Sequence, residues 1–115
     1  LREDKSKLLE AVGVEGTPEQ MAEQFELQTL LNDKVKNTVG HTSLNFSPED
    51  GERLKTDDAL MLQIAHDYMA KMGIENTQYI VARHTDREHP HCHIVFNRVD
   101  NDGKTISDKN DFYRN

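Results

Sequence analysis

Apolar and polar residues recur with two different periods along this chain, and these periods predict helices and strands in turn. Over residues 17–31, Thr17 as N-cap with Gln20 three residues later (the pattern of a capping box), a proline in the first turn and apolar residues about one helical turn apart predict an amphipathic helix. A stronger pattern predicts a helix over residues 57–72, with Thr56 as its cap and Gly73 as its end. The residues expected on its buried face are Leu60, Ile64, Ala65, Tyr68 and Met72.

Strands are predicted where the alternation has a period of two. Residues 41–46 alternate in this way, and the segments 78–84 and 91–99 are rich in Tyr, Ile, Val and Phe and are joined by a loop short enough for an antiparallel hairpin. Residues 8–12 form a weaker strand pattern, residues 47–50 a capped helical turn, and a further helix is expected from Asp108. The sum is an α+β fold, a two-layer sandwich in which helices pack on one face of an antiparallel sheet and the other face is polar.

The length of 115 residues fits one domain with one modest core, residues 1–115. The chain opens at Leu1 without methionine and stops at Asn115 within a charged stretch, so we expect a partial domain, truncated at both ends. The single cysteine, Cys92, excludes an internal disulfide framework, and no apolar run approaches the roughly 18 residues of a membrane span. We therefore expect a cytoplasmic protein without membrane contact. The net charge of -7 mildly disfavours nucleic-acid binding, although most of the acidic residues precede the histidines.

A cluster of histidines is the most informative chemical feature. His91 and His93 are two apart on a predicted strand, so both imidazoles project from one face, and His84 ends the strand before them. Across a hairpin, these three can bind one divalent metal and leave coordination positions open, as catalytic sites do. Surface histidines without a role and a structural metal site are the plainer alternatives. Structural sites usually use cysteine, however, and Cys92 points to the opposite face.

Three segments carry a resemblance to a known family. The stretch 84–98 (HTDREHPHCHIVFNR) resembles the third motif of the MobA-type relaxases, the mobilisation and T-DNA border endonucleases within the HUH endonucleases. Cys92 stands where the family has a bulky apolar residue. Residues 40–50 (GHTSLNFSPED) resemble the family's second motif. Residues 103–107 (GKTIS) resemble the segment that usually follows the third motif in this family.

The resemblance implies a reaction and a set of roles. A tyrosine oxygen would attack a phosphodiester of single-stranded DNA at an origin of transfer, and leave a 5′-phosphotyrosine and a free 3′-OH. His84, His91 and His93 would hold the divalent metal, Mg or Mn in function with Zn, Ni or Co also possible, and Asp86 would orient a ligand or take the tyrosine proton. The family places its tyrosine near the N-terminus, so we expect the nucleophile upstream of Leu1.

Further residues are expected to contact the DNA, either from the loop or from the polar sheet face. These residues are His41, Ser43, His89, Asn97 and Arg98. For His41 and Ser43 the alternative is an exposed strand face, for His89 a plain loop residue, and for Asp86 a turn residue. The expected partners are origin DNA, relaxosome accessory proteins and a coupling protein, in a bacterial cytoplasm.

Three rival functions fit parts of the same pattern. A replication-initiator or transposase HUH nuclease also joins DNA to tyrosine, but its tyrosine follows the histidine pair, and no well-placed tyrosine does so up to Asn115. A three-histidine hydrolase of a small molecule would need an enclosed pocket and a general base such as Glu88. A non-catalytic metal-binding module remains if no upstream tyrosine exists.

Overall fold

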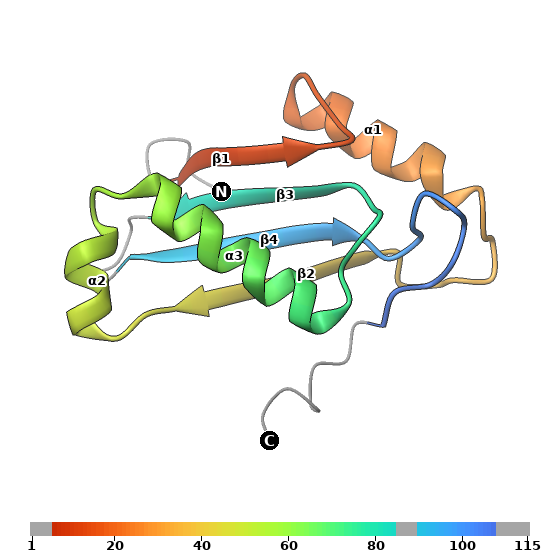
Figure 1. The fold of residues 1–115 in the computed structure, drawn as a ribbon. Helices are drawn as coiled ribbons and strands as arrows, with labels where there is room; N and C mark the ends of the chain where they lie inside the picture. Colours follow the sequence, from red (N-terminus) through yellow and green to blue (C-terminus); the bar gives the residue numbers. More distant parts are fainter. Residues whose placement is uncertain (1–5, 85–89, 108–115) are drawn as a thin grey trace.

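The computed structural model describes residues 6–84 and 90–107 of the chain (Figure 1). The elements of this part, in chain order, are β1 (Ser6–Val12), α1 (Pro18–Thr29), β2 (Val39–Asn45), α2 (Pro48–Leu54), α3 (Asp58–Met72), β3 (Tyr79–His84) and β4 (His91–Asn97). The strands predicted from the alternation are present close to their expected bounds, and the α+β fold is confirmed. Asp86, His89 and the helix expected from Asp108 lie outside the described residues.

The strands form one antiparallel sheet in the order β1-β3-β4-β2. β3 and β4 pair as the predicted hairpin, with His84 opposite His91, so the two strands of the hairpin lie in the middle of the sheet. In β1 the register shifts between Leu8 and Glu10. Leu8 pairs with Ala82 and Glu10 with Val81, so this β-bulge turns Leu8 and Glu10 to opposite faces.

Helix α3 crosses one face of the sheet and covers the main hydrophobic core (Figure 1). Sheet residues Val81, Cys92, Ile94 and Phe96 supply the other side of this core. Burial raises the pKa of the Cys92 thiol to about 11, which keeps it protonated and unreactive. The buried residues of α3 are Met61, Ala65, Tyr68, Met69 and Met72.

The buried stripe of α3 is therefore turned slightly from the one expected. Leu60 and Ile64 are only partly buried on its flank, and Met61 and Met69 take the centre. Apolar residues occupy both stripes, so the sequence pattern cannot decide between them. The N-cap is Asp57, whose side chain accepts from the Leu60 amide at 2.9 Å, and not Thr56.

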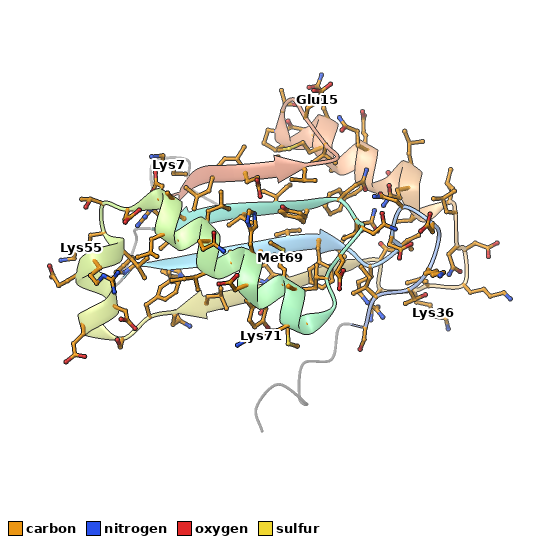
Figure 2. All side chains as sticks on the ribbon, in the orientation of Figure 1. Lys7, Glu15, Lys36, Lys55, Met69 and Lys71 are labelled. Atoms are coloured by element: carbon orange, nitrogen blue, oxygen red, sulfur yellow. The ribbon has the colours of Figure 1, made fainter. Side chains whose placement is uncertain are left out.

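Ion pairs tie α3 to the strands beneath it. Arg83, buried on β3, donates through Nε to Asp58 Oδ1 at 2.7 Å, and Lys7 of β1 binds the same carboxylate from outside (Figure 2). The pKa of Asp58 is lowered, chiefly by the hydrogen bond from Lys7. Burial alone would raise this pKa, but the interactions with Lys7 and Arg83 together outweigh it. The start of α3 is thus anchored to both strands.

Helix α1 packs against the opposite face, so the expectation that the helices share one face holds only for α2 and α3. Met21 and Phe25 of α1 form a second, smaller core with Val14, against Ile80 and Val95 of the sheet. The predicted capping box is present, because Thr17 and Gln20 exchange side-chain hydrogen bonds with each other's backbone amides. None of the helices in the described ranges combines the length and apolar character of a bilayer-spanning segment.

Candidate metal centre

Three histidines meet on the sheet face that α1 leaves partly open. His84 is the last residue of β3, and His91 and His93 are the first and third of β4. His84 pairs directly with His91 across the hairpin, and His93 shares their face because side chains alternate along a strand. The convergence predicted from the sequence is confirmed, and it follows from the hairpin register.

The distances suit a shared ion. One ligand nitrogen from each histidine lies within 4.8 Å of the others. Ring centroids are 4.0 Å apart for His84 and His93, 5.1 Å for His91 and His93, and 5.4 Å for His84 and His91. Imidazole nitrogens bind zinc at about 2.0–2.1 Å, so nitrogens that share an ion lie at most about 4 Å apart. The nitrogens must therefore approach one another by up to about 1 Å to share one ion.

The donor set fits a catalytic divalent metal. His91 is buried and His84 and His93 are half-buried, so the site has a closed base and an accessible side. Neutral imidazoles suit Zn, Ni and Co and are compatible with Mn, and a set of three leaves coordination positions for a substrate oxygen. Cys92 faces the α3 core, as predicted, and cannot complete a structural site.

Strand β2 borders the cluster on one side. Ser43 lies opposite His93 and Asn45 opposite His91, and both are exposed. The Nε2 atom of His41 lies 2.8 Å from Nδ1 of His93, and the two rings are stacked with centroids 4.9 Å apart. Sequence reasoning placed His41 on this face but missed its contact with a ligand, because the register of β2 against β4 has no local signal.

An apolar groove of about 740 Å³ borders the cluster on another side. His41, His84 and His93 line one end of it. Its walls include Met21 and Phe25 of α1, Ile80 and Val95 of the sheet, and Leu8 and Val39 of the edge strands. The three histidines therefore lie where a cluster of polar side chains meets an apolar groove.

Two residues that were expected to contact DNA, Asn97 and Arg98, form hydrogen bonds within the protein. Asn97 is fully buried, and its amide donates to Phe25 O at 3.0 Å and to Gln78 Oε1 at 2.8 Å. Arg98 donates to the carbonyl oxygens of Ile106 and Asn37. α1 covers the Asn97 end of this sheet face, which the alternation of β4 alone cannot foretell. The DNA roles of Arg98, Ser43 and His89 stay predictions, while the geometry of Asn97 gives it a structural task.

The tyrosines of the described ranges belong to the other face. Tyr68 is buried in the α3 core, as expected, with its hydroxyl 3.3 Å from Thr42 Oγ1. Tyr79 donates to Glu10 Oε1 at 2.7 Å, beside His66. Burial, and then the Glu10 carboxylate, raise the pKa of Tyr79 to about 12. A hydroxyl on the wrong face with a raised pKa is a poor nucleophile for the histidine site.

Comparison with known protein families decides what this arrangement belongs to. A family model described as "Relaxase: MobA/VirD2-like, nuclease domain" matches residues 1–115. The chain belongs to this relaxase family. No curated protein and no solved structure gave a significant match.

Membership gives the histidine cluster of the relaxase domain its context. The relaxase family acts on DNA as a nuclease, and the cluster can hold the metal ion that such chemistry uses. The imidazoles lie on the paired middle strands of the sheet, where the backbone fixes their spacing. The relaxase domain thus presents three imidazoles, at a spacing set by the paired strands, beside an apolar groove.

Proposed function

We propose that this relaxase domain nicks single-stranded DNA at an origin of transfer by tyrosine transesterification, with a divalent metal held by His84, His91 and His93. The observation that carries the proposal is the convergence of three imidazoles, within 4.8 Å, on an accessible sheet face in a chain of the relaxase family. The groove beside them supports a nucleic-acid substrate, because unstacked bases offer flat apolar faces to such a surface.

The proposed step exchanges one phosphate ester for another. A tyrosine oxygen forms a bond to the phosphorus as the bond from phosphorus to O3′ breaks, which leaves a 5′-phosphotyrosine. The proton released by the tyrosine would pass to Asp86, and the departing 3′ oxygen would take a proton from solvent water to become a free hydroxyl. A divalent ion held by His84, His91 and His93 would supply positive charge near the phosphate oxygens, where charge builds in this reaction.

The side chains around the cluster position the DNA in this proposal. Ser43 lies opposite His93 and can donate its hydroxyl to a phosphate oxygen. His89 and Arg98 stay proposed contacts to the backbone of the strand. Arg98 follows the end of β4 away from His91, and its guanidinium also donates to Ile106 O and Asn37 O. The nucleophile is expected upstream of Leu1, and the placement of Tyr68 and Tyr79 on the α3 face supports a source outside the described residues.

The cofactor and partners follow from the same proposal. Mg or Mn is proposed as the metal in function, because both ions accept oxygen ligands, and a phosphate oxygen and water would fill the positions that three imidazoles leave open. Origin DNA, relaxosome accessory proteins and a coupling protein are the proposed partners, and the bacterial cytoplasm is the proposed compartment.

A covalent-adduct assay tests the proposal. The chain, extended by its natural upstream sequence, is incubated with Mn and a labelled single-stranded oligonucleotide that carries the origin of transfer. We expect a labelled product that migrates with the protein on a denaturing gel and carries the strand 3′ of the break. Peptide mapping of the adduct is expected to find the modified tyrosine upstream of Leu1.

The outcomes separate the rival functions. An adduct on Tyr113 would indicate the order of residues found in replication initiators and transposases. Cleavage without any adduct would show that water is the nucleophile, and a hydrolase would replace the relaxase mechanism. An adduct that forms equally well when His91 and His93 are both alanine would refute the metal site.

A further inference from the structure

One imidazole outside the metal cluster makes a direct contact with a proposed ligand. His41 lies on β2, where its register partner is Val95, so it reaches His93 diagonally across the β2–β4 ladder. Its Nε2 lies 2.8 Å from His93 Nδ1, and the rings are stacked with an interplanar angle of 19°. If Nδ1 keeps this contact when a metal binds, Nε2 is the nitrogen of His93 that would face the ion.

The chemistry of imidazole fixes the direction of this hydrogen bond when a metal is bound. A neutral imidazole has one N–H and one nitrogen lone pair. If His93 gives its Nε2 lone pair to a metal, its proton must be on Nδ1, which then donates to Nε2 of His41. His41 must in turn carry its own proton on Nδ1. The pair can therefore satisfy both rings in only one combination of tautomers.

We propose that His41 is a positioning residue that holds His93 in the tautomer and ring orientation required for metal binding. The inference rests on the proposed function and deepens it, since it names the outer partner of one ligand. Imidazole orientation about χ2 is broad, so an unsupported His93 loses orientational freedom when it binds a metal. A partner on the second nitrogen reduces that loss and raises the basicity of the ligand.

Positioning explains the geometry of His41 better than the DNA contact expected from its sequence motif. The nitrogen of His41 closest to the cluster is committed to His93, and the stacked rings hold both imidazoles at the end of the groove. Ser43, two residues along the same strand, lies nearer in register to His93 but has no comparable contact with it among the hydrogen bonds of the described residues. Asn45, which is exposed on the same strand opposite His91 and has no part in the proposed binding of metal or DNA, offers a matched control.

The test is calorimetric titration of the chain with Mn and, separately, with Zn. His41→Phe keeps a stacked ring but removes the acceptor, and it is expected to weaken metal binding about 10- to 100-fold. His41→Gln keeps a side-chain acceptor and is expected to recover most of the loss. Asn45→Ala should bind metal as the unchanged chain does, and His93→Ala should lose more affinity than His41→Phe.

A spectroscopic measurement separates positioning from a general structural effect. Long-range nitrogen–proton NMR of the zinc-loaded chain should show His93 with its proton on Nδ1 and His41 with its proton also on Nδ1. In His41→Phe, the His93 Nδ1 proton should lose the downfield shift of a strong hydrogen bond. The same shift in both proteins would overturn the proposal.

Other outcomes also decide the matter. Unchanged metal affinity in His41→Phe, with a loss in His93→Ala, would overturn the role of His41 while the proposed function stands. Unchanged affinity in His93→Ala would instead refute the metal centre itself. Equal losses in His41→Gln and His41→Phe would show that acceptance from His93 is not what matters. A loss of oligonucleotide affinity without a loss of metal affinity would return His41 to a DNA contact.

Discussion

Replacing Asn97 by alanine removes an amide that is fully buried between β4 and α1. Its nitrogen donates to Phe25 O at 3.0 Å and to Gln78 Oε1 at 2.8 Å, and its oxygen accepts from the Val99 amide at 3.0 Å. These three bonds connect α1, the segment before β3 and the end of β4. The substitution therefore tests whether this end of the sheet depends on one side chain.

The magnitude follows from the groups that lose their partners. The Val99 backbone amide and the side-chain oxygen Oε1 of Gln78 each lose a hydrogen bond in a buried setting. Phe25 O also loses a donor, but it is a backbone oxygen within helix α1. A buried polar group left unsatisfied costs about 1–3 kcal/mol, and relaxation of Gln78 reduces its share. We expect Asn97→Ala to lower the free energy of unfolding by about 2–4 kcal/mol, a large part of the roughly 5–15 kcal/mol of a small domain.

Urea unfolding followed by circular dichroism measures this change. Asn45→Ala is the matched control, because Asn45 is exposed on the same sheet face of β2, and its change should stay within about 0.5 kcal/mol. Metal affinity of folded Asn97→Ala should stay close to that of the unchanged chain. Equal stability of Asn97→Ala and the unchanged chain, together with weaker DNA binding, would refute the structural role and restore a DNA contact.

Two further substitutions probe the α3 side of the sheet. In Gly40→Ala, the new Cβ would overlap the ring of buried Phe96, so thermal unfolding should show a loss of about 1–3 kcal/mol, and an unchanged midpoint would contradict the close packing. Burial alone would raise the pKa of Glu10, but its hydrogen bonds with His66 and Tyr79 outweigh burial, so the pKa lies below its ordinary value of 4.5. The stability from ionised Glu10 is present above pH 4.5 and is lost as the pH falls through the lower folded pKa. Glu10→Gln should therefore flatten the fall of stability in acid, whereas Glu23→Gln on exposed α1 should not.

Much of the fold could be predicted from short sequence patterns. The capping box at Thr17 and the left-handed Gly73 at the end of α3 depend only on neighbouring residues, so the sequence predicts them directly. The hairpin and its histidine cluster follow from strand alternation and one short loop. These features need no knowledge of distant contacts.

The missed features depend on contacts between distant segments. The pairing of His41 with His93 requires the register of β2 against β4, and the burial of Asn97 requires α1 to dock on that end of the sheet. The alternation in β4 predicts the face of Asn97 correctly but says nothing about what covers it. In α3, adjacent apolar stripes left the direction of packing open.

The order of the strands places His41 on an edge strand and the three histidines of the cluster on inner strands. β3 and β4 are hydrogen-bonded on both sides, whereas β2 has one partner and forms an edge in the described part of the sheet. Edge strands fray at lower free energy than inner strands, so amide hydrogens of β2 should exchange sooner than those of β4. A transient opening of β2 would withdraw His41 while His84, His91 and His93 keep their spacing. If the three histidines hold a metal, local opening of β2 would remove the support of His93 by His41 and so speed metal exchange, while the spacing of the three ligands is kept.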